Sequence, residues 1–251
     1  MKVAILAGGQ GTRLAEETRV KSKAMVRIGD QPILWHLLKY YEHYGYTRFV
    51  IALGYHADSI RQYFVEELNS DPVSNGVQMV VRPKAEPHWT VELIDTGLET
   101  MSGGRIKRLA SYLDRPFMLT WCDGLADVDL PRLRDFHRAH GRLATLTTVH
   151  PPARFGRLTL AGDRITAFRE KTIDPDEWIN GAFFVLEPGV FQYIAGDDTQ
   201  WERDPLSRLA AEGQLMAHRH EGFWQCMDTL KEAQDLNALW RRGAAAWKVW
   251  A

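Results

Sequence analysis

Short apolar runs alternate with amphipathic stretches through residues 1–150. Val3-Ala4-Ile5-Leu6 is a continuous apolar run that ends at Gly8-Gly9, a pattern typical of a buried strand that leads into a loop. Pro32 opens an amphipathic stretch with apolar residues at helical spacing through Tyr44, and Gly45 closes it. This alternation predicts an α/β fold whose mostly parallel, doubly wound, Rossmann-like sheet is flanked by helices.

The same criteria place the other elements of residues 1–150. Strands are expected at Arg48–Leu53, Val77–Val81, Phe117–Thr120 and Ala144–Val149. Helices are expected at Asp58–Leu68, Gly104–Leu113 and Leu130–His140.

Residues 151–251 have a different pattern, because short strands at Gly156–Leu160 and Arg164–Phe168 flank the Gly162-Asp163 turn. Further strands are expected at Ile179–Leu186 and Leu215–Gln225, before a helix at Leu230–Arg242. We expect this part to make the sheet mixed, to add a small antiparallel portion, and to complete one single domain of residues 1–251.

Composition narrows the class of protein. The 31 Lys and Arg against 32 Asp and Glu leave a net charge of −1, which excludes a strongly basic nucleic-acid binder and an acidic tail protein. The two cysteines, Cys122 and Cys226, do not form the framework of a disulfide-rich secreted domain. No apolar stretch approaches the roughly 18 residues of a membrane helix. We therefore expect a cytoplasmic protein with no nucleic-acid partner and no membrane.

The segment Leu6 to Leu14 carries the strongest chemical signal. Three glycines in four residues let backbone N–H groups face an anion, and Arg13 adds a planar cation that suits phosphate. The spacing excludes the Walker loop, and Leu14 stands where the dinucleotide fingerprint needs a glycine. The position after a first strand favours phosphate binding, while a simple strand-to-helix turn is the alternative.

A second cationic element is Lys21-Ser22-Lys23. Paired lysines usually lie in solvated loops, which is the plainer interpretation. Lys23, however, comes directly before apolar Ala24-Met25-Val26, which places it at the mouth of a core element.

The pattern Leu-Ala-Gly-Gly-x-Gly-Thr-Arg-Leu, followed by Lys23 ten residues after Arg13, is similar to that of the sugar-phosphate nucleotidylyltransferases. Within them, the chain most resembles the glucose-1-phosphate cytidylyltransferases. The segments that support the resemblance follow in order along the whole chain: Pro32-Ile33-Leu34-Trp35-His36, Asp95-Thr96-Gly97, Gly103-Gly104-Arg105-Ile106-Lys107-Arg108, Asp123-Gly124, Arg154-Phe155-Gly156, Glu170-Lys171, Ile179-Asn180-Gly181, Phe223-Trp224-Gln225, Met227-Asp228-Thr229-Leu230 and Trp247-Lys248.

The resemblance implies an enzyme that transfers a cytidylyl group from CTP to a sugar 1-phosphate, glucose 1-phosphate in the nearest relatives, and releases pyrophosphate. The attacking phosphate oxygen is already ionised near neutral pH, so the reaction needs no general base. Positioning, charge neutralisation and in-line displacement carry the catalysis. By the same resemblance, residues 1–150 hold the nucleotide, residues 151–251 hold the sugar phosphate, and the chain forms a homo-oligomer.

The resemblance also assigns the site residues. Arg13, Lys23 and Asp123 form the catalytic set, in which Lys23 binds the α-phosphate and Arg13 holds the leaving pyrophosphate. Asp123 and Asp228 are the ligands of one Mg²⁺, an ion that prefers carboxylate oxygens. Arg13 and Lys23 also contact the nucleotide, together with Leu6, Ala7, Gly8, Gly9, Gln10, Gly11, Thr12, Thr100, Arg105 and Cys122. The sugar phosphate is assigned to Gly156, Glu170, Lys171, Asn180 and Gly181.

Each assignment has a plainer structural interpretation. Asp123-Gly124 is also a common turn, and Arg169-Glu170-Lys171 is also a charged strand end. The segment around Thr100 and Arg105 also reads as a helix start capped by Ser102.

Five positions depart from the family pattern. Ser22 and Ala24 stand in place of two prolines, which predicts a less rigid loop around the catalytic lysine. Cys122 and Ala182 stand in place of glycines, and Thr172 in place of a proline, all beside the metal or the sugar phosphate. A different NTP, or a modified sugar or polyol phosphate, is therefore an alternative. A non-catalytic regulatory protein that binds a nucleotide sugar is another.

Other features are interpreted as structural. His137 and His140 are expected to face solvent from one helix, and His218 and His220 to lie on a surface strand. Cys122 is expected to be a small buried residue and not a nucleophile. The tryptophans of the last quarter are expected in the core and in subunit contacts: Trp201, Trp224, Trp240, Trp247 and Trp250.

Overall fold

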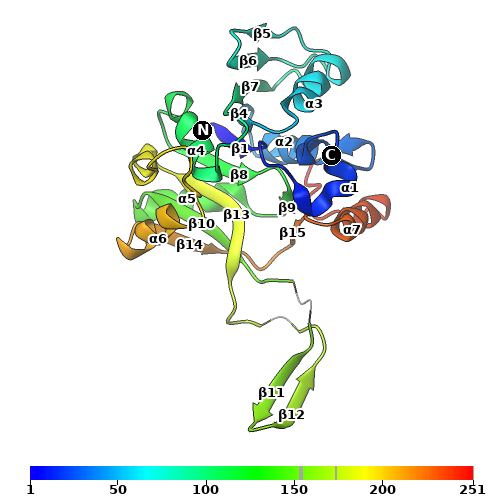
Figure 1. The fold of residues 1–251 in the computed structure, drawn as a ribbon, viewed down its shortest axis with the longest axis vertical. Helices are drawn as coiled ribbons and strands as arrows, with labels where there is room; N and C mark the ends of the chain where they lie inside the picture. The colour runs from blue at the N-terminus through cyan, green and yellow to red at the C-terminus, as the bar shows by residue number, and fades with distance from the viewer. Residues whose placement is uncertain (153–154, 173, 251) are drawn as a thin grey trace.

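The computed structural model describes residues 1–152, 155–172 and 174–250, and within these residues nine strands form one mixed sheet (Figure 1). Their order across the sheet is β14 (Leu215–Arg219), β10 (Ala144–Val149), β13 (Ile179–Leu186), β8 (Phe117–Trp121), β1 (Val3–Leu6), β4 (Arg48–Leu53), β7 (Thr90–Asp95), β6 (Gln78–Val81) and β5 (Val73–Ser74). The α/β class and the mixed, mostly parallel centre are confirmed.

The four central strands β8, β1, β4 and β7 run parallel. Leu6, the last residue of β1, pairs with Ala52 on one side and Trp121 on the other. The carboxyl ends of these strands therefore lie along one edge, where ligands bind in open α/β sheets. Strand β13 runs antiparallel to both β8 and β10, and β6 runs antiparallel to β7.

Both faces of the sheet are covered, which explains why β1 is apolar at every position. Val3 and Ile5 belong to one buried cluster, and Ala4 and Leu6 belong to the other. The first cluster contains side chains of α2 (Ile33–His43), α3 (Ala57–Gln62), α5 (Leu130–His140) and α7 (Leu230–Arg241). The second contains side chains of α4 (Ser102–Arg108) and α6 (Asp204–Ala211).

Smaller elements complete the chain. Three two-stranded ladders pair β2 (Arg27–Ile28) with β3 (Gln31–Pro32), β9 (Gly124–Ala126) with β15 (Trp224–Cys226), and β11 (Arg157–Ala161) with β12 (Arg164–Arg169). The remaining turns are η1 (Thr12–Leu14), α1 (Ala15–Thr18), η2 (Lys23–Met25), the π-helical turn η3 (Tyr63–Glu67), η4 (Ala110–Tyr112) and η5 (Pro188–Tyr193). None of the helices in the described ranges is long and apolar enough to span a membrane.

Several element boundaries differ from those expected. Strand β7 was not predicted, because polar Glu92 interrupts its apolar run; in the fold Glu92 accepts a hydrogen bond from Lys2 at 2.7 Å. The helix expected at Gly104–Leu113 begins earlier, at Ser102, and stops at Arg108 before the separate turn η4.

The β11–β12 hairpin stands away from the sheet (Figure 1). Its antiparallel pairing is as expected from the Gly162-Asp163 turn. The hairpin, and Phe155 two residues before it, expose large apolar side chains: Phe155, Leu158, Leu160, Ile165 and Phe168. A two-stranded hairpin is marginally stable alone, so a surface of this kind is expected to pack against something.

The C-terminal segment packs against α2 around one buried histidine. His36 is fully buried, and its ring lies edge-on to Trp240 at 4.7 Å between centroids. Its Nε2 lies 2.8 Å from the carbonyl oxygen of Ile28, and its Nδ1 accepts a hydrogen bond from Trp247 Nε1 at 3.4 Å. Both ring nitrogens are thus satisfied by a neutral imidazole with its proton on Nε2. The core position expected for Trp247 is confirmed.

The prediction that His137 faces solvent is wrong, because its side chain is only 2% exposed. Its Nδ1 lies 2.8 Å from the hydroxyl oxygen of Thr145, and His140 Nε2 lies 2.7 Å from the same oxygen. The two imidazoles therefore fasten α5 to β10.

We predict that acid destabilises the protein partly through His36. Burial lowers the pKa of His36 from 6.5 to about 4. The neutral ring therefore stabilises the fold fully above pH 6.5, and up to about 3 kcal/mol of that contribution is lost as the pH falls towards 4. Urea unfolding at pH 7 and pH 5 measures the loss, which should be smaller in His36→Gln. Equal pH dependence in both proteins would refute the assignment.

Candidate functional site

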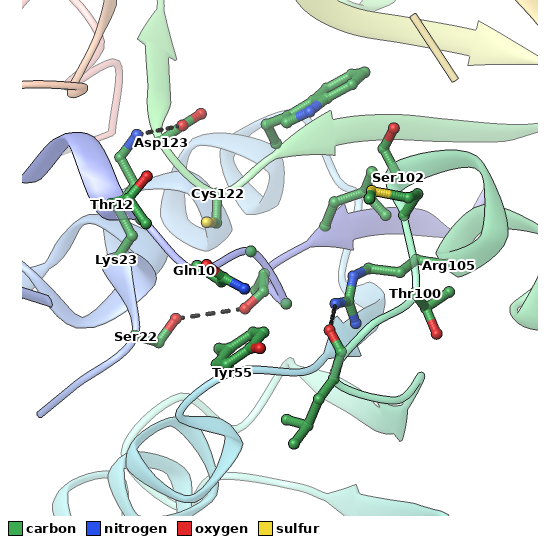
Figure 2. A pocket seen from close by; sticks show the side chains of 18 of the residues that line it. Gln10, Thr12, Ser22, Lys23, Tyr55, Thr100, Ser102, Arg105, Cys122 and Asp123 are labelled. Carbon is green, nitrogen blue, oxygen red and sulfur yellow. Dashed lines mark hydrogen bonds and ion pairs between the residues drawn. The ribbon is translucent and has the colours of Figure 1, made fainter. Parts of the chain in front are cut away.

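A cavity of about 490 Å³ opens at the carboxyl ends of the parallel strands (Figure 2). It is lined by the glycine loop after β1, the start of η2, the end of β8 and the segment before α4. All the residues that the sequence assigned to the nucleotide line this cavity, apart from Arg13. The side chain of Arg13 is not among those that the structure describes. Further lining residues were not assigned to the nucleotide from the sequence: Ser22, Tyr55, Leu98, Glu99, Met101, Ser102 and Trp121.

The glycine loop has the backbone that its composition predicts. Gly11 adopts a φ of +65°, a left-handed conformation that favours glycine, and its carbonyl accepts a hydrogen bond from Leu14 N at 3.0 Å. Gly8 is required for a different reason. A Cβ at Gly8 would lie 2.4 Å from Nη1 of Arg105, so a side chain there would displace the guanidinium.

Lys23 lies between two carboxylates. Its Nζ donates to Asp123 Oδ2 at 2.7 Å and to Asp228 Oδ1 at 2.6 Å. Burial lowers the pKa of Lys23, but attraction to and hydrogen bonds with both carboxylates outweigh burial and raise that pKa above its ordinary value. Lys23 is therefore a fixed cation at this end of the cavity.

Local structure positions these three groups. Asp123 follows β8, and Asp228 lies between β15 and α7. Glu232 accepts hydrogen bonds from the backbone N–H groups of Asp228 at 2.8 Å and Thr229 at 2.9 Å, and Thr229 caps α7 in return. The capping box thus also fixes the backbone that presents Asp228.

The loop without prolines is fastened by Ser22. The Ser22 N–H donates to Ser59 Oγ at 3.0 Å, a bond that a proline at this position would not make. The Ser22 hydroxyl accepts from Ala24 N at 3.3 Å and lies 3.4 Å from the carbonyl oxygen of Ala7. The lower rigidity expected for this loop stays a prediction, but hydrogen bonds join it to the glycine loop and to α3.

The carboxylate pair fits a divalent cation. Lys23, Asp123 and Asp228 carry a formal charge of 1 − 2 = −1, and a divalent ion would bring the cluster to +1. Both carboxylates converge on one atom, and their hard oxygens suit Mg²⁺. No three His, Cys, Asp or Glu side chains in the described ranges are arranged to hold a metal.

Cys122 lies beside this cluster and is buried. Burial, together with the charge of Asp123, raises the pKa of the Cys122 thiol to about 12. The thiol is therefore protonated near neutral pH and a poor nucleophile, in line with the structural role expected from the sequence.

Arg105 lies at the opposite end of the cavity and is only 4% exposed. Its guanidinium donates to backbone carbonyls of Leu53, Gly97 and Leu98 at 2.7 to 3.0 Å.

The sequence-based expectation that Ser102 caps the helix before Arg105 is wrong. The N-cap of α4 is Met101, and the Ser102 hydroxyl instead donates to Glu202 at 2.6 Å.

The residues assigned to the sugar phosphate fall into two groups, and none is among the side chains that line the described cavity. Glu170 and Lys171 follow the β11–β12 hairpin and are more than half exposed. A Cβ on Gly156 would lie 2.9 Å from Glu170 Oε2, so Gly156 is their neighbour. Asn180 and Gly181 lie in β13, within the main sheet.

The position where Ala182 replaces the family's glycine is strained. Ala182 has a φ of +61°, a conformation that glycine adopts without steric cost. Its N–H donates to Asn180 Oδ1 at 2.7 Å, and the Gly181 carbonyl accepts from Trp224 Nε1 at 2.8 Å. These bonds hold β13 in a local turn of the backbone beside the assigned sugar contacts.

The fold and the cavity together define an α/β protein with a candidate ligand site at the carboxyl edge of its parallel strands. Comparison with known families matches the nucleotidyl transferase model over residues 2–235. The glucose-1-phosphate cytidylyltransferase of Salmonella typhimurium is 47% identical over 256 residues, with complete coverage of both chains. A relative from Bacillus subtilis is 40% identical over 258 residues, also with complete coverage. The chain belongs to the nucleotidyl transferase family.

Solved structures agree with this fold. The crystal structure of HddC from Yersinia pseudotuberculosis has a TM-score of 0.72 at 21% identity, covering 95% of this chain and 99% of that one. At this identity the likeness concerns the fold alone.

Proposed function

We propose that this protein transfers a cytidylyl group from CTP to glucose 1-phosphate, giving CDP-glucose and pyrophosphate. The observation that carries the proposal is the Lys23 ammonium held between Asp123 and Asp228 in the cavity that the glycine loop lines. The full-length similarity to glucose-1-phosphate cytidylyltransferases supports the choice of nucleotide and sugar.

The reaction is an in-line displacement at the α-phosphorus. A phosphate oxygen of glucose 1-phosphate forms the new P–O bond, the bond from the α-phosphorus to its bridging oxygen breaks, and pyrophosphate leaves with that electron pair. Two anions must approach each other, and a pair of unit charges at 4 Å repels by about 4 kcal/mol near a protein surface. The site must therefore offset charge more than it must move protons.

Lys23 supplies the fixed positive charge for this step. Its carboxylate partners keep it protonated, and its Nζ lies where the first strand and β8 end. The α-phosphate would take one of the positions around Nζ, so that the ammonium stabilises charge that develops in the transition state. Arg13, from the turn after the glycine loop, would hold the leaving pyrophosphate.

Asp123 and Asp228 would hold a Mg²⁺. When bound, the ion would neutralise phosphate charge and orient the phosphate oxygens. The two carboxylates would then divide their contacts between the ion and Lys23, which remains next to them.

The sugar-phosphate contacts fit a site made by two copies of the chain. Asn180 and Gly181 lie in the body of one copy, whereas Glu170 and Lys171 belong to the projecting hairpin. The exposed apolar side chains of that hairpin need a covering surface. We therefore infer a homo-oligomer in which the hairpin of one copy brings Lys171 to the sugar phosphate bound by another.

The function is tested by mixing the protein with each NTP and a panel of sugar and polyol phosphates in the presence of Mg²⁺. Pyrophosphate release should be fastest with CTP and glucose 1-phosphate, and mass spectrometry should show CDP-glucose. If no pair of substrates releases pyrophosphate, nucleotidyl transfer is refuted. If another pair reacts faster than CTP with glucose 1-phosphate, the assignment of the substrates must be corrected.

Lys23→Ala is the matched control for that assay. It should fold, because the lysine ends in the cavity, and it should lose several orders of magnitude in turnover. Turnover near that of the unchanged protein would show that Lys23 is not catalytic.

The shared site is tested by complementation. Lys23→Ala and Lys171→Ala should each be nearly inactive alone. Mixed subunits should regain activity, because some sites then combine an intact Lys23 with an intact Lys171 from another copy. Light scattering should show an oligomer. A monomer, or mixtures with no recovery after subunit exchange, would contradict the shared site.

A further inference from the structure

Arg105 is a buried cation held without a carboxylate. No ion pair within the described ranges involves its guanidinium, and its hydrogen-bond partners are neutral. They come from the carboxyl ends of two adjacent parallel strands: the Leu53 carbonyl of β4, and residues 96–98 directly after β7. Gly8 and Gly54 make room on the other side, since a Cβ on either would lie within 2.5 Å of Nη1.

Thr96 is the one side chain among these partners. Its hydroxyl donates to the Leu53 carbonyl at 2.6 Å and accepts from Arg105 Nη1 at 2.7 Å. Thr96 is fully buried and does not line the described cavity, so its contact with a ligand would have to pass through Arg105. The hydroxyl fixes the direction of Nη1 because its own proton is committed to Leu53.

The hydrogen bonds leave some donors of Arg105 for a ligand. A guanidinium carries five N–H donors and accepts nothing. Three acceptors share the two Nη1 hydrogens, one acceptor takes an Nη2 hydrogen, and no hydrogen bond within the described ranges uses Nε. One Nη2 hydrogen and the Nε hydrogen therefore remain on Arg105, which lines the end of the cavity away from Lys23 (Figure 2).

We propose that Thr96 is a positioning residue that sets nucleotide preference by aiming this donor pair of Arg105 at the base. The proposal rests on the proposed use of CTP. Cytosine presents two adjacent acceptors, O2 and N3, to such a pair. Uracil presents O2 beside N3–H. Because N3–H is a donor, one N–H group of the guanidinium would face another donor instead of an acceptor. A guanidinium held in this orientation favours CTP over UTP. A guanidinium that is free to rotate discriminates less between the two nucleotides.

The test compares Thr96→Val, which keeps the shape but loses the hydroxyl, with Thr96→Ser, which keeps the hydroxyl. In Thr96→Val the KM for CTP should rise about tenfold with kcat changed less than about threefold, the effect of losing a hydrogen bond to a charged group. The ratio of kcat/KM for CTP to that for UTP should fall about tenfold. In Thr96→Ser, the KM for CTP and the CTP-to-UTP ratio of kcat/KM should both lie within about threefold of the values of the unchanged protein.

Thr90→Val is the matched control, because Thr90 begins β7, the strand that Thr96 follows, at the end away from the cavity, and the substitution should leave both values unchanged. A double-mutant cycle with Arg105→Lys should show that the valine adds little once the guanidinium is gone. Thr96→Ala is measured alongside to remove the hydroxyl without adding a second methyl group.

The outcomes separate the hypotheses. If the unchanged protein does not use CTP, the proposed function fails. If it uses CTP but Thr96→Val keeps the KM and the CTP-to-UTP ratio, only the role of Thr96 is refuted. The same holds if serine fails to rescue, if the two substitutions act additively, or if both valine and alanine variants lose their fold in melting experiments, which would assign the hydroxyl to the fold alone.

Discussion

The site depends on the contact between the Lys23 ammonium and the carboxylates of Asp123 and Asp228. These residues are 100 and 205 positions away from Lys23 in the chain. The parallel pairing of β1 with β8 brings Lys23 and Asp123 to the same edge of the sheet. The capping box of α7 holds the backbone that presents Asp228. The cluster carries a net charge of −1, and two of its members, Lys23 and Asp123, line the cavity.

Lys23 and Arg105 both line the cavity, and different interactions hold them in place. Lys23 is held by charge, between two carboxylates that in the proposed reaction would also bind a metal ion. Arg105 is held by carbonyl dipoles and one hydroxyl on fixed strand ends, which offer it no alternative geometry. The difference suits their proposed tasks: Lys23 meets phosphates whose charge changes during the reaction, whereas Arg105 meets a base that does not change.

The sequence predicted those parts of the site that depend on local pattern. The glycine loop and Asp123 follow buried apolar runs, and Lys23 comes directly before one, so their place near the strand ends could be inferred. Thr96 gave no such signal, because its role comes from a carbonyl on the neighbouring strand. His137 was misplaced because the helical pattern does not show that Thr145 lies beside it. The single domain, the Mg²⁺ and the roles of the sugar contacts stay predictions, since they concern ligands, partners or boundaries beyond a chain's local pattern.

We propose that the carboxylates which hold Lys23 also bind the metal that accompanies the nucleotide. The most direct test is the affinity for CTP, measured by calorimetry with and without Mg²⁺, in the unchanged protein, in Asp228→Asn and in the exposed control Asp30→Asn. Mg²⁺ should tighten CTP binding in the unchanged protein and in the control, and Asp228→Asn should lose at least about tenfold of that gain. An equal gain from Mg²⁺ in all three proteins would contradict the claim.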